Sequence, residues 1–332
     1  MIKKAIIYSI AIMSLIASRG FAQKPALFAA NTISTEDDEF GITFSPDGKT
    51  CFFTKKTPST ITSSTYVICY SRFIHNKWQP PQLAPFSGKY KDLNPSFSPD
   101  GTKLFFISNR PGTNKKTMDG DIWVVKKTVD GWSEPENIGA PVNTPGWEIS
   151  CSATASGALY FISLNTTTGK QALYRSAYLN DKYEMPVVIG DTANAFEDAA
   201  DIYVAPDESY LLFSSAARSD VLTATSGASA EYPRSDIYIS FNKNGVWTVP
   251  QNAGAAVNST AEESTPTVSA DGKTLYFTSE RNFITIPMPH RLTYESLEAA
   301  LHGVGNGLGD IYYMPVNMLL KKIKPVNEKK VN

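Results

Sequence analysis

The stretch Phe97-Ser98-Pro99-Asp100-Gly101, followed by the apolar run 104–108, decides the fold because the chain repeats it. Proline presets φ, aspartate bonds the backbone ahead and glycine accepts a positive φ, so the motif predicts a tight turn between two strands. Four further copies, two close and two degenerate, give the equivalent positions Asp47, Asp100, Ser156, Asp207 and Asp271. Their spacings of 53, 56, 51 and 64 residues predict five repeated supersecondary units.

Each unit carries two more strand signals after this hairpin. The first is an Asp-Ile-aromatic segment, clearest at Asp121, Asp236 and Asp310. The second is a Trp or Tyr followed by proline, as in Trp132-Ser133-Glu134-Pro135, and it leads into a fourth strand. Four antiparallel strands, which we call A to D, are the content of one propeller blade. We therefore expect an all-β fold: a five-bladed β-propeller of four-stranded antiparallel blades.

The fifth unit lacks a D strand at its own end of the sequence. The segment 25–31 near the N-terminus resembles 135–143 and 250–258, which begin D strands in other units. We therefore expect the ring to be closed by the N-terminal strand. The alternative is a chance match, which would leave the fifth blade with an exposed edge.

These turns and strand signals resemble the WD40-like Pro-Asp repeat of the TolB type over residues 25 to 316. The same repeat is similar to the propellers of tricorn-like and prolyl-oligopeptidase-like peptidases. The resemblance implies the fold, whereas propellers host hydrolases, lyases and binding modules alike. TolB proteins carry an additional α/β domain before the propeller, and this chain resembles the propeller alone. It also has no Gly-x-Ser-x-Gly motif of the kind that marks a serine hydrolase domain.

The composition excludes several function classes. The 332 residues include 31 basic and 32 acidic side chains, so no strong overall field attracts nucleic acid or an anionic membrane. Three histidines lie in unrelated segments, and three cysteines cannot form a disulfide framework. We expect no metal and no cofactor. Cys51 and Cys69 fall on adjacent strands of one blade, where they could face each other or stay buried thiols.

The N-terminus has the features of a secretion signal. Lys3 and Lys4 precede an apolar run, and Gly20-Phe21-Ala22 offers a small-residue cleavage site. The alternative, a membrane anchor, is disfavoured because the run is too short to cross a hydrocarbon core about 30 Å thick. We expect a signal peptide at 1–22, the propeller at 23–316 and a Lys-rich tail at 317–332. The mature chain would be a periplasmic or secreted monomer without a transmembrane segment.

Loop lengths distinguish the two ends of the expected ring. The A–B and C–D turns are short, whereas B–C connections such as 216–234 and 281–308 are long. Binding residues concentrate on long loops held by a rigid scaffold, so we place binding on this long-loop face. Within 284–308, a helix is expected from Thr293 to His302, with Gly303 after it. The alternative role for this insertion is a lid that covers the channel mouth.

A register of charged residues falls at the same end. Nine residues before the turn glycine stand acids, and nine after it stand arginines, with the fourth unit displaced by one position. The candidate binding residues are Glu39, Asp92, Arg110, Glu148, Asp198, Arg218, Glu263 and Arg281. Because strand A lines the channel of a propeller, we expect a ring of carboxylates backed by guanidinium groups at the mouth. These residues could lock the A–B hairpins as ion pairs, bind a cation or a polar ligand, or take part in catalysis.

Two function hypotheses follow from these patterns. The first is a non-enzymatic exported propeller that binds an envelope protein or a cell-envelope glycan through the long-loop face. The second is a glycan-active hydrolase that uses channel-mouth carboxylates such as Glu39, Glu148 and Glu263, because glycosidases work with paired carboxyl groups.

Overall fold

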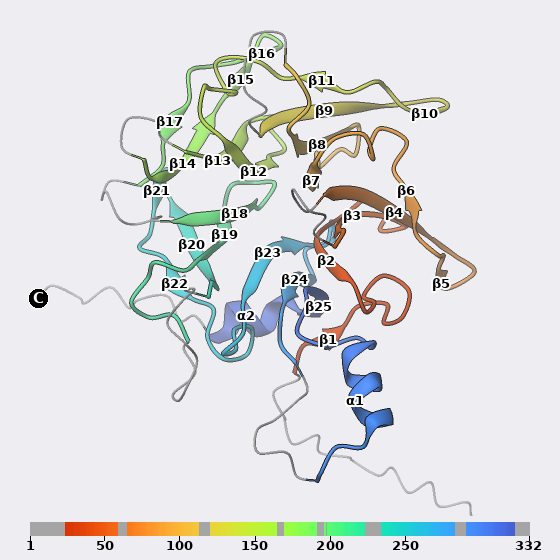
Figure 1. The fold of residues 1–332 in the computed structure, drawn as a ribbon. Coiled ribbons are helices and arrows are strands. Elements are labelled where there is room, and N and C mark those ends of the chain that lie inside the picture. The colour runs from red at the N-terminus through yellow and green to blue at the C-terminus, as the bar shows by residue number, and fades with distance from the viewer. Residues whose placement is uncertain are drawn as a thin grey trace, which may run out of the picture.

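The computed structural model describes residues 24–58, 65–112, 120–164, 169–190, 196, 198–222, 234–282 and 290–322. The predicted signal peptide lies outside these residues. Figure 1 shows five β-sheets arranged around one axis, each turning the edge of its first strand to the centre. The chain is an all-β, five-bladed propeller of antiparallel sheets, as predicted.

Each blade has an A strand at the channel and B and C strands outside it. The A strands are β2 (Asp38–Phe44), β7 (Asp92–Phe97), β12 (Glu148–Ala153), β18 (Ala199–Val204) and β23 (Glu263–Val268). The B strands are β3 (Thr50–Lys56), β8 (Lys103–Ser108), β13 (Leu159–Leu164), β19 (Tyr210–Ser215) and β24 (Thr274–Ser279). The C strands are β4 (Tyr66–Ile74), β9 (Asp121–Thr128), β14 (Gln171–Ser176), β20 (Asp236–Lys243) and β25 (Asp310–Pro315).

The outer D position is built from short pieces. In three blades it consists of the pairs β5 (Lys77–Trp78) and β6 (Gln82–Leu83), β10 (Gly131–Trp132) and β11 (Glu136–Asn137), and β21 (Val246–Trp247) and β22 (Gln251–Asn252). The third blade has the hairpin β15 (Tyr178–Leu179) and β16 (Lys182–Tyr183), then β17 (Val187–Val188). Proline separates the pieces because it cannot donate a ladder hydrogen bond, which an outer edge tolerates.

The ring closes through the N-terminal strand. In the fifth blade the order is β1-β25-β24-β23, where β1 spans Ala26–Leu27, and Leu27 pairs with Tyr312. Phe28 follows it into the core and meets the rings of Tyr276 and Trp78 edge-on, at centroid distances of 5.1 and 5.5 Å. First and last segments therefore share a sheet, which confirms the predicted closure.

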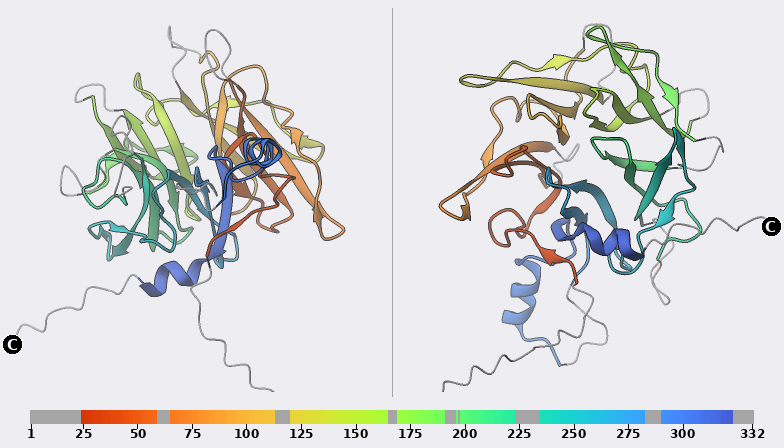
Figure 2. Two further views of the ribbon diagram at one scale, coloured as in Figure 1. Left: turned by 60° about the horizontal axis from the view of Figure 1, so that its bottom comes forward. Right: turned by 180° about the vertical axis from the view of Figure 1, so that it is seen from behind.

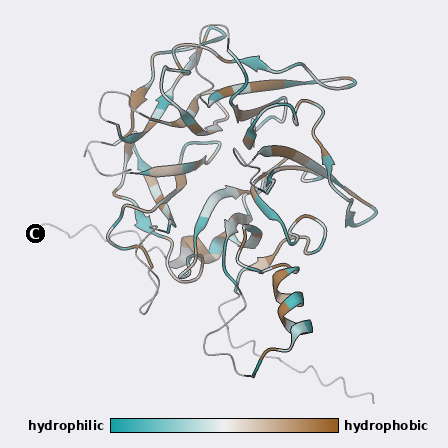
Figure 3. Ribbon diagram, in the orientation of Figure 1, coloured by the Kyte–Doolittle hydropathy of each residue, from teal (hydrophilic) through white to brown (hydrophobic). Residues whose placement is uncertain are grey.

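The hydrophobic core lies between neighbouring blades. One cluster combines Phe52 of the first blade with Phe106 and Trp123 of the second. Figure 3 shows hydrophobic colour along strands of the blades, while hydrophilic colour is common in the loops. Each blade is thus held mainly by its two neighbours. The rigid ring that results fixes the ends of the loops around the channel.

Two short helices flank β25 in the sequence. The second, α2 (Val316–Lys322), begins where a Lys-rich tail was expected, and its residues Val316 and Leu319 are buried in the core of the last two blades. No helix among the described residues is long and apolar enough to cross a membrane. The first turns of the tail are therefore packed on the propeller.

α1 (Tyr294–Leu301) is the helix expected in the last long loop. Thr293 caps it and forms a capping box with Ser296, and the helix ends at His302. None of its residues is buried. Viewed down the ring axis from either side, α1 lies outside the ring of blades (Figures 1 and 2). The helix does not cover the channel, so the alternative role of a lid is not supported for it.

Candidate functional site at the channel

The four carboxylates expected at the channel mouth are inside the protein. Glu39, Asp92, Glu148 and Glu263 are each 0% exposed. They stand at or next to the start of their A strands, and each side chain accepts a hydrogen bond from a serine or threonine that precedes it in the D–A connection. The expectation that they form a ring open to the channel mouth is therefore corrected.

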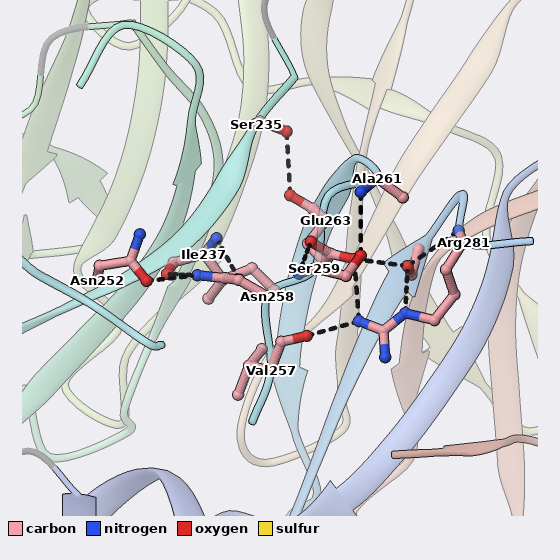
Figure 4. Close-up of polar contacts among 10 residues, drawn as sticks. Ser235, Ile237, Asn252, Val257, Asn258, Ser259, Ala261, Glu263 and Arg281 are labelled. Carbon is pink, nitrogen blue, oxygen red and sulfur yellow. Dashed lines mark hydrogen bonds and ion pairs between the residues drawn. The ribbon is translucent and has the colours of Figure 1, made fainter. Parts of the chain in front are cut away.

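The fifth blade shows how such a carboxylate is held (Figure 4). Glu263 accepts hydrogen bonds from Ser259 N at 2.7 Å, Ser259 Oγ at 2.6 Å and Ser279 Oγ at 2.7 Å. Arg281 Nη2 lies 2.9 Å from Glu263 Oε1 and also donates to the carbonyl of Val257. The carboxylate thus ties the D–A connection to the end of strand B.

The second blade repeats this arrangement. Arg110 Nη2 donates to Asp92 Oδ1 at 2.7 Å and to the carbonyl of Phe86 at 3.0 Å. Its Nε donates to Ser108 Oγ, which itself donates to Asp92. The guanidinium carbon lies 5.3 Å from the centre of the Trp123 ring. The predicted pairing of acid and arginine is therefore present in blades 2 and 5.

The first and third blades use other donors. In the first, Lys55 Nζ lies 3.1 Å from Glu39 Oε1, and Thr35 donates to the carboxylate from both its N and its Oγ1. Burial outweighs these bonds and raises the pKa of Glu39. In the third, Thr144 Oγ1 and Ser163 Oγ donate to Glu148 at 2.8 and 3.0 Å.

The fourth blade departs from the prediction. Asp198 is exposed, and no ion pair joins it to Arg218, although the structure describes both residues. Arg218 Nε instead lies 3.5 Å from Asp220 Oδ1. Ala199 occupies the acid position, and Asp198, one position earlier, is exposed and has a positive φ of 49°. The expected Asp198–Arg218 pair is corrected accordingly.

Asparagines connect this network to the preceding blade. Asn258 Oδ1 accepts from Ile237 N at 2.9 Å, and its Nδ2 donates to Ile237 O at 3.0 Å (Figure 4). Asn143 makes the same two bonds with Ile122. The buried carboxylates and these asparagines together join consecutive blades, which is a structural role. Ligand binding by the carboxylates stays a prediction.

The residues one position earlier in each unit are exposed or half-buried. We call this set the mouth ring, and it consists of Asp38, Lys91, Trp147, Asp198 and Glu262. Three of its side chains lie beside the residue that precedes strand C of the neighbouring blade, Asp38 at Gly309, Trp147 at Gly120 and Glu262 at Ser235. Two of these residues accept a backbone hydrogen bond from the facing end of strand B. Glu280 N donates to Glu262 O, and Leu164 N donates to Trp147 O, each at 3.0 Å. Counting back from the turn glycine by one further residue would have found them.

One rung of the mouth ring brings two acids together. Glu262 and Glu280 lie on opposite strands of one hairpin, and like charges in such positions are destabilising. Burial, followed by the charge of Glu280, raises the pKa of Glu262, and burial followed by the charge of Asp38 raises that of Glu280. The equivalent rung of the first blade holds an ion pair instead, with Lys56 Nζ 3.0 Å from Asp38 Oδ2.

Trp147 is the aromatic member of the mouth ring, and it is 56% exposed. Its indole lies against Gly120, where a β-carbon would collide with the ring. Large exposed aromatic side chains are enriched in binding surfaces. The glycine thus leaves room for the indole beside the start of strand C of the preceding blade, where the ring stays exposed.

Among the described residues, the channel has a narrow middle and a wide cavity toward one end. A cavity of about 40 Å³ lies in the middle, among residues of all five A strands. A cavity of about 430 Å³ lies among the A–B turns and is also lined by Leu320 of α2. This cavity is at the end of the channel opposite to the long-loop face.

The cysteines and histidines give no site. Cys51, Cys69 and Cys151 are free, and Cys69 pairs with Phe53 across the strands rather than with Cys51. Burial raises the pKa of the Cys51 thiol, which makes it a poor nucleophile. Within the described ranges, no group of three or more His, Cys, Asp or Glu side chains could hold a metal ion.

Comparison with known proteins finds similarity in structure but not in sequence. No family model matches the chain, and no curated protein matches it in sequence. Among solved structures, the nidogen–laminin complex aligns with a TM-score of 0.44 and 11% identity over 70% of each chain. The periplasmic gluconolactonase of Pseudomonas aeruginosa aligns with 0.39 and 17% over 73% of this chain and 65% of its own. A glucose dehydrogenase aligns with 0.42 and 10% over 85% and 83%. These are likenesses of fold and carry no functional argument.

Proposed function

We propose that this protein is an exported binding propeller of the WD40-like, TolB type, which engages a cell-envelope glycan or envelope protein through its long-loop face. Export to the periplasm or the medium is inferred from the signal-like segment 1–22. The assignment to the TolB type is inferred from the Pro-Asp turns.

The observation that carries this proposal is Trp147 in the mouth ring. Its exposed indole offers a flat apolar surface on which a sugar ring can stack, with a polar N–H at its edge. Asp198 and Glu262 occupy the same register in the next two blades, where carboxylates can accept hydrogen bonds from hydroxyl groups. The combination of an aromatic platform and carboxylates favours a glycan as the ligand.

The test compares Trp147→Ala with Leu320→Ala, which alters the wide end of the channel. Both proteins and the wild type are assayed for binding to envelope polysaccharides and to envelope extract. We expect Trp147→Ala to lose at least tenfold in affinity and Leu320→Ala to bind like the wild type. Equal binding by all three proteins would remove the long-loop face from consideration, and selective loss in Leu320→Ala would move the site to the other end.

A second candidate function is glycan hydrolysis by Glu262 and Glu280. The specific observation is the raised pKa of both partly buried acids on facing strands, which suits a general acid. These residues replace Glu39, Glu148 and Glu263, whose carboxylates are buried. Release of reducing ends from envelope polysaccharides should fall more than a hundredfold in Glu262→Gln and Glu280→Gln, but not in the exposed variant Glu136→Gln. If the wild-type protein releases no reducing ends, the hydrolase hypothesis is wrong and binding is the function that remains proposed.

A further inference from the structure

A polar ring surrounds the narrow middle of the channel. Each A strand is irregular there, and the register with strand B shifts within every one of them. The equivalent residues, one from each blade, are Gly41, Asn94, Ser150, Asp201 and Thr265. All five line the central cavity of about 40 Å³. A single water needs roughly 10 to 15 Å³ of such space, so the cavity can hold an ion with one or two waters.

Asp201 places a carboxylate in this cavity without a balancing charge. Its Oδ2 accepts hydrogen bonds from Ser214 Oγ at 2.7 Å and Thr265 N at 3.1 Å. Its Oδ1 has one long contact, at 3.5 Å, with Asn94 Nδ2 from across the channel. In the part of the chain that the structure describes, no basic side chain balances it, and burial raises its pKa. An ionised carboxylate in such a place is costly unless a cation joins it.

Asn94 adds a second oxygen that lacks a partner. Its Nδ2 donates to Ile149 O at 3.1 Å, which fixes the orientation of the amide. Its Oδ1 is buried, and no hydrogen-bond partner for it exists among the described residues. This oxygen lies against Gly41, where a β-carbon would come within 2.9 Å of it. Glycine at position 41 therefore leaves space next to Asn94 Oδ1, which has no hydrogen-bond donor among the described residues.

Asp201 is close enough to the long-loop face to act on another acid. Burial, then the charge of Glu280 and then that of Asp201 raise the pKa of Glu262. Basic side chains accompany the acids at that face, where Lys56 Nζ lies 3.0 Å from Asp38 Oδ2 and Arg234 Nη1 lies 3.9 Å from Glu280 Oε2. Asp201 has no such ion pair among the described residues.

We propose that the middle of the channel is a calcium site, held by the carboxylate of Asp201 and the amide oxygen of Asn94, with the hydroxyls of Ser150 and Thr265. All of these ligands are oxygens, which hard cations such as Ca²⁺ prefer. Ser150 Oγ accepts one backbone N–H, from Ile202, and retains a second lone pair. Thr265 Oγ1 accepts from Gly41 N and lies 2.7 Å from Thr278 Oγ1, and it retains a lone pair when it donates its own proton to Thr278. The site contains only one carboxylate and no His or Cys. It is therefore not one of the groups of three or more His, Cys, Asp or Glu side chains that are absent from the described ranges.

The experiment uses the mature chain treated with a chelator and then dialysed. Thermal unfolding and calorimetric titration are followed with Ca²⁺, Mg²⁺ and Na⁺ added separately. A ligand that binds the folded state raises Tm with its concentration. We expect Ca²⁺ to bind with a stoichiometry of one and to raise Tm, and Na⁺ at equal ionic strength to do neither. Absence of calcium binding by the wild type would overturn the proposal.

Two variants locate the site. Asp201→Asn keeps the shape and removes the charge, so calcium should no longer raise its Tm, whereas Asp181→Asn, at an exposed outer turn of the third blade, should respond like the wild type. If Asp201→Asn fails to fold, Asn94→Gly serves instead, because glycine accepts the positive φ of 51° found there. It should weaken calcium binding at least tenfold. Unchanged calcium affinity in Asn94→Gly, or an unchanged Tm response in Asp201→Asn, would place the ion elsewhere and contradict the assignment.

Discussion

Arg110 and Asp92 form an ion pair of 2.7 Å at which the two side chains are 9% and 0% exposed. Water barely reaches this pair, so its charges are screened far less than those of a surface pair. Removing one partner leaves the other as an unbalanced buried charge, which is more costly than losing the contact itself. The stabilising contribution of each side chain in this pair therefore depends on the presence of the other.

The first prediction concerns this dependence. Asp92→Asn and Arg110→Gln should each lower the free energy of unfolding, and the double variant should lose less than their sum. We expect a coupling of about 0.5 to 3 kcal/mol, measured by urea unfolding of the four proteins. The control cycle uses Lys126 and Glu136, an ion pair whose side chains are 51% and 54% exposed. Its coupling should be about 0 to 1 kcal/mol. If the losses of unfolding free energy at Asp92 and Arg110 are strictly additive, the two side chains do not depend on each other.

The second prediction concerns the fourth blade, where the acid register is broken. Because Asp198 is exposed and not joined to Arg218, Asp198→Asn should change the free energy of unfolding by less than about 0.5 kcal/mol. The double variant with Arg218→Gln should show no coupling. The measurement is the same urea cycle, with Asp92 and Arg110 as the positive comparison. A coupling as large as theirs would mean that Asp198 pairs with Arg218 in solution.

The third prediction concerns ring closure. Phe28→Ala should destabilise the protein by about 3 to 5 kcal/mol, because this buried ring anchors the closing strand against four aromatic side chains. Removing residues 24–30 should also expose the edge of β25 and promote aggregation. Tm and light scattering are measured, with the fully exposed Val129→Ala as control. A shortened chain with the wild-type Tm would show that β1 does not close the ring.

The fold could be predicted from the sequence because its signals are local and repeated. A Pro-Asp-Gly turn such as Pro99-Asp100-Gly101 fixes a hairpin by its own backbone preferences, whatever surrounds it. Five repeats then set the number of blades. The resemblance of 25–31 to other D strands even predicted a pairing between opposite ends of the chain, because that pairing repeats a local pattern.

The site was harder to predict because exposure depends on neighbours in space. A carboxylate at the start of strand A looks the same in sequence whether it faces the channel or turns back to the D–A connection. Glu263 turns back because Ser259 and Ser279 offer hydroxyl donors there, and neither is adjacent to it in sequence. Asp201 could not be identified from the sequence for a related reason. That it lacks a charge partner is seen only when the five A strands are placed around the channel.

Asp310 begins the last C strand with a carboxylate that is poorly satisfied. In blades 2 and 4 the equivalent aspartates accept from the amides of Asn137 and Asn252. Leu27 pairs at that position in the fifth blade and offers no such donor. Asp310 Oδ2 accepts from Gly305 N at 2.7 Å, and burial raises the pKa of the carboxyl to about 6.

The fourth prediction is the pH dependence that results. The unfolded chain releases the Asp310 proton near pH 4, whereas the folded chain keeps it until about pH 6, so the folded state binds more protons in between. Its contribution to stability is therefore full at low pH and is lost as pH rises toward 6. Urea unfolding from pH 4 to 8 should show Asp310→Asn gaining stability relative to the wild type across that window. Asp47→Asn is a control, because the hydrogen bond from Ser45 lowers the pKa of Asp47 and the stability that this carboxylate contributes is lost only below pH 4. This variant should therefore differ from the wild type by a constant amount from pH 4 to 8. A profile of Asp310→Asn that also runs parallel to the wild type would show that Asp310 titrates normally.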